Sequence, residues 1–251
     1  MACLLVIPVL RLNLILDDAW GETMKRVCRA SWGTAQLSML LALFNGVLAH
    51  VIVPGAAAAE QRPIRIVALG DSLTAGFMLR ATDSFPARLE QVLKAKGYAV
   101  EVINAGVSGD TTAAALERFE WAVPDGIDAA IVELGANDAL RGLDPALARR
   151  NLDAIIRRLK AKGAEILIAG MLAPRNWGRS YAQQFDAIFA DLAETHGALL
   201  YPFFLDGVAL RQDLNLDDGM HPNSKGVEEI IARILPSVEE LIRRAAAKRN
   251  R

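Results

Sequence analysis

Cysteine and histidine are both scarce in this chain. Its 251 residues include two cysteines, Cys3 and Cys28, and three histidines. Both cysteines precede a run of alanines that ends at residue 59, where the composition of the chain changes. If the chain is cut there, the remainder has no thiol, which excludes thiolate catalysis, thiolate metal sites and disulfides. A domain without thiols also fits an oxidising compartment such as a periplasm.

An excess of charge of one sign is lacking as well. The formal net charge is −1, from 28 basic and 29 acidic residues, and no stretch gathers the lysine and arginine density that binds a phosphate backbone. The sequence therefore predicts no nucleic-acid partner. Hydrophobic residues make up 53% of the chain, which is ample for the core of one domain of ordinary size.

The segment before residue 60 is typical of a secretory signal. MKRVCRASW supplies basic residues, an apolar run follows at 37–53, and PGAAAAEQ supplies the small residues that a signal peptidase accepts. Polar residues dilute the apolar run, which favours cleavage over a retained membrane anchor. We interpret residues 1–59 as an N-terminal extension and signal peptide that starts at Met24, and residues 60–251 as the functional domain. The expected location is periplasmic or secreted.

Short apolar runs alternate with amphipathic stretches from residue 63 onward. Predicted strands cover 64–70, 99–106, 128–135, 165–171 and 198–204, and predicted helices cover 84–96, 111–122, 145–162, 180–195 and 224–244. This alternation predicts an α/β fold with three layers, in which helices cover both faces of a central five-stranded parallel sheet. Ligands of such sheets bind outside the carboxyl ends of the strands. Polar residues gather at those ends in GDS, NAGVSGD and GANDALRG.

The stretch ALGDSLTAGF, which follows the first predicted strand, is open to three interpretations. A nucleotide phosphate loop is disfavoured because neither glycine-rich phosphate motif occurs. A flavin site on a flavodoxin-like sheet stays open. A nucleophilic serine, Ser72, requires a base, and His196 at an apparent helix end is explained by structure alone. His221 lies in the polar turn DDGMHPN, directly before the last helix, and is the better candidate.

A serine hydroxyl becomes a nucleophile when an imidazole takes its proton and a carboxylate holds the other ring nitrogen. Asp218 lies three residues before His221, so one turn of backbone can bring it to the ring; Asp217 is the competitor. Negative charge that develops on a carbonyl oxygen needs positioned donors. Gly106 offers an unobstructed backbone N–H, and Asn137 offers a carboxamide.

GDSLTAGF, NAGVSGDTT, GANDALRG and DGMHPN together resemble the four sequence blocks of the GDSL, or SGNH, hydrolases, and the resemblance extends over 63–245. The chain is most similar to the periplasmic branch that contains arylesterase, acyl-CoA thioesterase I and lysophospholipase L1. The resemblance implies the flavodoxin-like SGNH hydrolase fold. It also implies that Ser72 is the nucleophile of a triad with Asp218 and His221. The N–H groups of Ser72 and Gly106 and the Nδ2 of Asn137 would form the oxyanion hole.

The expected reaction is hydrolysis of carboxylic esters or thioesters through an acyl-serine intermediate, without a metal or an organic cofactor. The expected partner is a small-molecule substrate such as an aryl or acyl ester, acyl-CoA or a lysophospholipid. Trp177 and Tyr181 could line an acyl pocket or lie in a solvated loop, and Arg141 could bind an anionic head group or form a surface salt bridge. A carbohydrate O-deacetylase, a non-catalytic ligand-binding module and a flavin carrier remain as alternatives.

Overall fold

One sheet of five parallel strands forms the centre of the part of the chain that the computed structural model describes, residues 62–251. The strands lie in the order β2-β1-β3-β4-β5, which is the flavodoxin-like order. Their bounds are Ile64–Gly70 (β1), Val100–Gly106 (β2), Ala129–Glu133 (β3), Glu165–Ala169 (β4) and Leu199–Tyr201 (β5). The predicted leader, residues 1–59 with its start at Met24, lies outside the described residues and stays a prediction.

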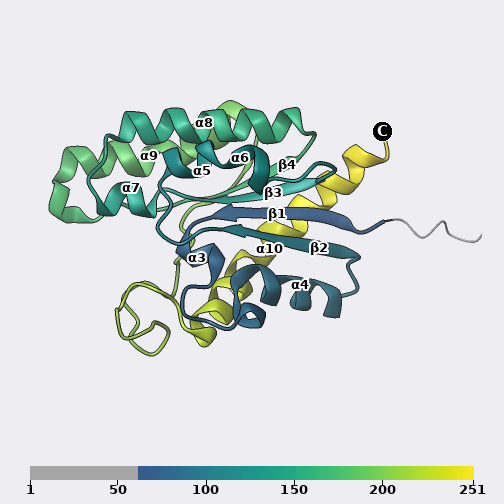
Figure 1. The fold of residues 1–251 in the computed structure, drawn as a ribbon, viewed down its shortest axis with the longest axis horizontal. Coiled ribbons are helices and arrows are strands. Elements are labelled where there is room, and N and C mark those ends of the chain that lie inside the picture. Colours follow the sequence, from purple (N-terminus) through teal and green to yellow (C-terminus); the bar gives the residue numbers. More distant parts are fainter. Residues whose placement is uncertain (1–61) are drawn as a thin grey trace, which may run out of the picture. The chain divides into compact units, whose positions relative to one another are not determined.

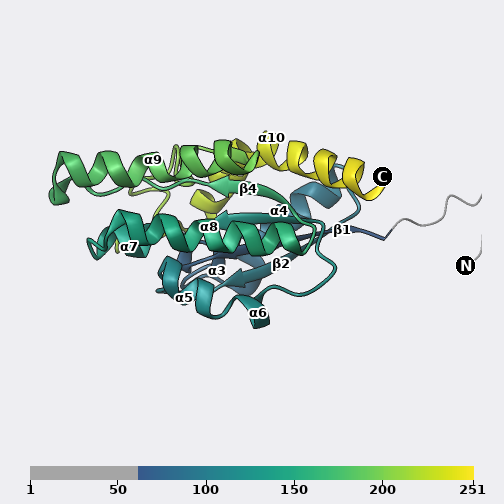
Figure 2. The same ribbon diagram turned by 90° about the horizontal axis from the view of Figure 1, so that it is seen from above.

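Helices cover both faces of the sheet (Figure 1), which confirms the predicted three-layer fold. One face carries α5 (Thr112–Glu117), α6 (Phe119–Ala122), α7 (Ala136–Leu140), α8 (Pro145–Ala161) and α9 (Arg179–His196). The other carries α3 (Ser72–Ala75), α4 (Phe85–Ala95) and α10 (Ser224–Arg249), and two short 3₁₀ turns occupy Ala81–Asp83 and Arg175–Trp177. Figure 2 shows α8 and α9 side by side along the sheet. None of the helices between residues 62 and 251 is long and apolar enough to cross a membrane.

Local sequence explains where the main elements begin. The central strand β3 is buried at all five of its residues, as expected for a strand covered by helices on both faces. Pro145 occupies the first turn of α8, and the Asp144 carboxylate accepts a hydrogen bond from the Ala146 N–H at 2.9 Å. Asn223 caps α10 in the same way, with bonds from the N–H groups of Lys225 and Gly226. Local capping residues therefore fix where α8 and α10 begin after the loops that precede them.

Three elements depart most from their predicted bounds, and the other bounds agree to within two residues at either end. The last strand ends at Tyr201, and the chain bends at Pro202. The helix predicted over 111–122 is divided into α5 and α6 at Arg118. α10 continues to Arg249, beyond its predicted end at residue 244, and Pro236 does not interrupt it. The Ala232 carbonyl, which loses its donor to the proline ring, belongs to an exposed residue.

Arg118 divides the predicted helix because its side chain binds the edge of the sheet. The guanidinium donates hydrogen bonds to the carbonyls of Gly70 at 3.0 Å and Ala105 at 2.8 Å, next to the ends of β1 and β2. It also forms an ion pair with Asp110, and the two side chains are only 7% and 11% exposed. One buried cation therefore holds together the ends of two strands and the loop after β2.

Arg118→Ala should reduce the free energy of unfolding by about 3–5 kcal/mol, because removing one partner leaves a buried, uncompensated Asp110. Urea denaturation measures the loss. The control is Arg243→Ala, which breaks an ion pair with Glu240 whose arginine is 73% exposed, and should cost less than about 1 kcal/mol. Equal losses for the two variants would contradict the role given to Arg118.

Candidate active site

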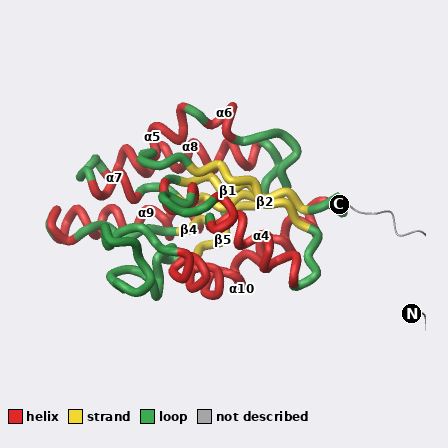
Figure 3. Tube along the Cα trace, turned by 60° about the horizontal axis from the view of Figure 1, so that its bottom comes forward, coloured by secondary structure: helices red, strands yellow, loops and turns green. Residues whose placement is uncertain are grey.

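The long connection between β5 and α10, residues 202–223, lies beside the carboxyl ends of the strands (Figure 3). Asn215 and Pro222 form an isolated antiparallel bridge, and the Leu216 N–H donates to the His221 carbonyl at 2.8 Å. The buried Asn215 carboxamide donates to the carbonyls of Val208 and Arg211. This bridge closes a tight turn over 216–221, which carries Asp218 and His221.

Three side chains from this turn and from α3 form a continuous chain of hydrogen bonds. The Ser72 Oγ lies 3.0 Å from the His221 Nε2, although the two residues are 149 positions apart in the sequence. The His221 Nδ1 lies 2.6 Å from the Asp218 Oδ2. A hydroxyl, an imidazole and a carboxylate are thus linked in series by hydrogen bonds, in the order that acyl transfer requires.

The Asp218 carboxylate is held ionised by its own turn. Its Oδ1 accepts hydrogen bonds from the backbone N–H groups of His221 at 3.0 Å and Met220 at 2.9 Å. These bonds, followed by the bond from the His221 ring, lower the pKa of Asp218 to about 2. The adjacent Asp217 is exposed, and the ring is bonded to Asp218 instead.

Phe77 packs against the imidazole of His221. The centroids of the two rings are 4.4 Å apart, with an angle of 36° between the ring planes. Phe77 is the last residue of ALGDSLTAGF, and its position after a turn gives no sequence signal of this contact. The packing restricts the orientation of the ring and covers one of its faces.

The three expected oxyanion donors come from three different elements at this edge: α3, the end of β2 and α7. Ser72 is the first residue of α3, so its N–H has no acceptor within the helix. The Gly106 N–H donates to the Asn104 Oδ1 at 3.0 Å, and a Cβ at Gly106 would lie 2.3 Å from the Ala75 nitrogen. The close approach of α3 to the end of β2 therefore requires glycine at 106.

Asn137 lies in the first turn of α7 with its carboxamide turned toward the loops after β1 and β2. Its Nδ2 lies 3.0 Å from the Asp110 carbonyl oxygen and 3.2 Å from the Asp71 Oδ2. An oxyanion would therefore have to share or replace an internal acceptor at Asn137, as at Gly106. Both acceptors of Asn137 belong to loops that follow neighbouring strands.

A cavity of about 460 Å³ opens beside Ser72 and His221. Its volume is within the usual range for small-molecule sites. Most of its lining is apolar and includes Leu73, Leu140, Met171, Leu172, Phe203 and Leu210. No lysine or arginine of the described chain lines it. The segments after β4 and β5 supply four of these side chains, and the polar-residue signal that identified the first three loops could not have found them.

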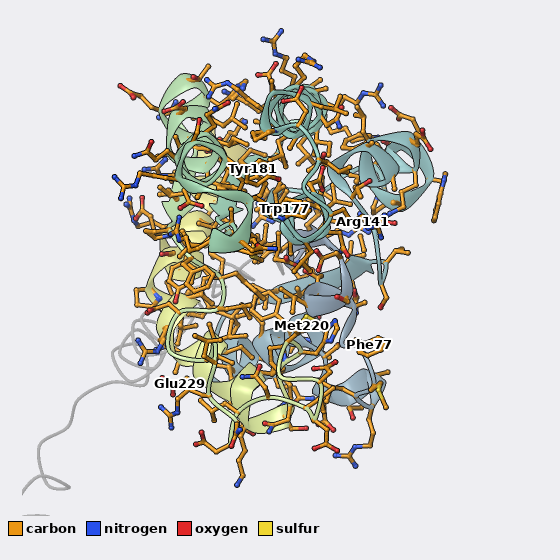
Figure 4. The ribbon with its side chains drawn as sticks, turned by 90° about the vertical axis from the view of Figure 1, so that its left-hand side faces the viewer. Phe77, Arg141, Trp177, Tyr181, Met220 and Glu229 are labelled. Atoms are coloured by element: carbon orange, nitrogen blue, oxygen red, sulfur yellow. The ribbon has the colours of Figure 1, made fainter. Side chains whose placement is uncertain are left out.

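Trp177, Tyr181 and Arg141 are not among the residues that line this cavity. The Tyr181 hydroxyl donates to the Leu143 carbonyl at 2.9 Å, and the Trp177 indole covers Gly142. Arg141 donates to the Gly109 carbonyl at 3.0 Å. Figure 4 shows the three as a group apart from Phe77 and Met220. They hold the loops around the site, and Arg141 forms no surface salt bridge among those recorded for 62–251.

The second histidine of the described chain has a structural environment. The His196 Nε2 lies 2.7 Å from the Asp153 Oδ1, and the ring is mostly buried at the end of α9. Gly197 follows in the left-handed conformation that terminates a helix. Within residues 62–251, no group of three or more His, Cys, Asp or Glu side chains is arranged to hold a metal ion.

Comparison with known proteins places this geometry in context. Residues 68–228 match the model of the GDSL-like lipase/acylhydrolase family. Esterase TesA from Pseudomonas aeruginosa is 33% identical over 201 residues, which cover 80% of this chain and 98% of the relative. Thioesterase 1/protease 1/lysophospholipase L1 from Escherichia coli is 38% identical over 63% of this chain and 75% of its own length. The crystal structure of AlinE4, an SGNH-hydrolase family esterase, is 48% identical with a TM-score of 0.60, covering 71% of this chain and 96% of AlinE4.

The Asp218 carboxyl should stay ionised down to a pH of about 2 in the folded protein. Because backbone N–H donors are the main cause of its low pKa, His221→Ala should leave the pKa of Asp218 well below the ordinary value. Carboxyl ¹³C NMR titration measures both values. A return to the ordinary pKa of about 3.9 in His221→Ala would show that the ring, and not the turn, controls the carboxylate.

Proposed function

The chain belongs to the GDSL-like lipase/acylhydrolase family, and we propose that it is a serine hydrolase of small carboxylic esters and thioesters that carry an apolar acyl group. The single observation that carries this proposal is the hydrogen-bonded series Ser72–His221–Asp218 at the mouth of an apolar cavity. The relatives named above are esterases and a thioesterase, which supports the reaction class.

In this reaction the Ser72 Oγ attacks the acyl carbon while the His221 Nε2 takes its proton. The tetrahedral intermediate collapses to an acyl-serine, and the imidazolium returns the proton to the departing alcohol or thiol. Water then attacks the acyl-serine, again with His221 as base, and the acid is released. Asp218 keeps its charge throughout and holds the Nδ1 side of the ring.

The negative oxygen of the intermediate is assigned to the N–H groups of Ser72 and Gly106 and the Nδ2 of Asn137. A charged oxygen is a stronger acceptor than a neutral amide oxygen, so it can replace the Asn104 Oδ1 at the Gly106 N–H. These donors act on charge that is present only after attack, and so lower the barrier more than they strengthen binding.

The lining of the cavity favours binding of an apolar acyl group over binding of a sugar. Aliphatic and aromatic side chains supply most of its lining. One of its few amides, that of Asn215, already donates to two backbone carbonyls. The lining has no cation for a phosphate or carboxylate, so a charged head group would have to lie outside the cavity.

A fluorophosphonate probe should label Ser72, and Ser72→Ala or His221→Ala should each abolish nearly all turnover. The double variant should be little worse than either, because nucleophile and base act as one unit. Intact-protein and peptide mass spectrometry locate the adduct, and ester hydrolysis measures the loss.

His196→Ala is the matched control because it also removes a histidine bonded to an aspartate. It should retain most activity, provided thermal melting shows that the variant is folded. An adduct on another serine, or no adduct on the folded protein, would contradict a Ser72 hydrolase.

A panel of p-nitrophenyl esters of increasing chain length, an acyl-CoA, a lysophospholipid and an acetylated sugar tests the substrate class. We expect kcat/KM to rise from the acetyl ester to longer acyl groups, because each buried methylene contributes about 0.8 kcal/mol. Leu172→Asp should reduce the preference for longer chains. A preference for the acetylated sugar would replace the proposal with O-deacetylation.

A further inference from the structure

We propose that Asp71 is a positioning residue for the oxyanion hole: its carboxylate ties the Asn137 carboxamide to the turn that carries Ser72. This inference rests on the proposed function. Asp71 precedes the nucleophile in the chain and is completely buried. Neither the reaction scheme nor the sequence motifs assign it a role.

The carboxylate of Asp71 makes two contacts, one through each oxygen. The Oδ1 accepts a hydrogen bond from the Leu73 N–H at 3.0 Å, which caps the start of α3. The Oδ2 lies 3.2 Å from the Asn137 Nδ2 at the start of α7. One rigid group therefore fixes the distance between the Ser72 N–H, inside the capped turn, and the side-chain donor of Asn137.

Only a carboxylate can serve both partners, because both are N–H donors. An asparagine at position 71 has one acceptor oxygen and one NH₂ group. Whichever way its amide is turned, NH₂ faces either the Leu73 N–H or the Asn137 Nδ2. The variant Asp71→Asn is close to the natural residue in shape but loses one of the two contacts.

A second buried carboxyl group, that of Glu133, lies near Asp71, and the environment of the pair decides which of the two carries the negative charge. Glu133, from β3, accepts a hydrogen bond from the Thr74 hydroxyl at 2.7 Å on its Oε2, and its Oε1 has no partner within the described chain. Burial, together with the charge of Asp71, raises the pKa of Glu133 well above its ordinary value. Glu133 is therefore the protonated member of the pair, and Asp71 is the member that can be charged.

The charge of Asp71 itself depends on pH. Burial raises its pKa to about 6, opposed by its bonds from Leu73 and Asn137. The other charged or titratable groups that face it are Glu133 from β3, His221 from the turn before α10, and Asp110 from the loop after β2, which is paired with Arg118. As the pH falls through about 6, Asp71 gains a proton and its hold on Asn137 weakens.

A double-mutant cycle in kcat tests whether Asp71 acts through Asn137. Asn137→Ala should lower kcat by about 10²–10³ with a smaller change in KM, and Asp71→Asn alone by about 10–100-fold. In the Asn137→Ala background, Asp71→Asn should cost less than about twofold, because the donor that it positions is gone. A full, multiplicative loss in that background would overturn the proposal.

Asp138→Asn is the matched control for this cycle. Asp138 is also buried, is next to Asn137 in α7, and accepts bonds from the Thr112 N–H at 2.8 Å and the Thr112 hydroxyl at 2.6 Å. When kcat is calculated per folded molecule, Asp138→Asn should change it by the same factor, within about twofold, in the natural protein and in the Asn137→Ala variant. If the loss of kcat caused by Asp138→Asn also disappeared in the Asn137→Ala background, the effect would be a general one on α7. That result would overturn the specific role of Asp71.

The pH dependence of kcat/KM keeps the proposal testable if Asp71→Asn does not fold. Each protonation that lowers activity steepens the acid limb of the profile. Below a pH of about 6, the acid limb of kcat/KM should be steeper in the natural protein than in Asn137→Ala. In that variant only protonation of the base of the triad still lowers the activity. Equal slopes would overturn the proposal. Failure of the fluorophosphonate to label Ser72 would instead remove the proposed function itself.

Discussion

The hydrogen bond between Ser72 and His221 is the contact on which the arrangement of the site depends. It joins the first loop of the domain to a turn near its C-terminal helix, 149 residues later. The parallel sheet makes the contact possible, because all its strands end at the same edge and the loops that follow them converge there. The separate parts of the site are short segments, each brought to that edge by the strand before it.

Buried polar groups tie those segments to one another. Arg118 binds the carbonyls at the ends of β1 and β2, Asp138 binds Thr112, and Asp71 spans α3 and α7. Such groups are costly to bury unless each is hydrogen-bonded, so they specify one arrangement of the loops. The Oε1 of Glu133, which has no partner within the described chain, is an exception close to Asp71, and protonation reduces the cost of burying this carboxyl.

The donors around Ser72 are satisfied internally before substrate binds. Gly106 donates to Asn104, and Asn137 donates to Asp71 and Asp110. This arrangement avoids unpaired buried donors in the free protein, which would cost about 1–3 kcal/mol each. Because the internal acceptors are fixed, the donors also keep their direction; in the proposed reaction a developing oxyanion would share or replace an internal acceptor without turning the donors.

The sequence by itself determined the order of the elements, the parallel sheet and the candidate residues Ser72, Asp218 and His221. Those features are local: apolar runs specify β1 and β3, Asp144 and Pro145 start α8, and Asp218 reaches His221 within one turn. Only the tertiary structure decided that Phe77 packs on His221, that Trp177 and Tyr181 support loops, and that the ends of β4 and β5 line the cavity. It also decided the burial of Asp71 beside Glu133, because the environment of a side chain depends on residues far away in the chain, whereas propensity and spacing act between near neighbours.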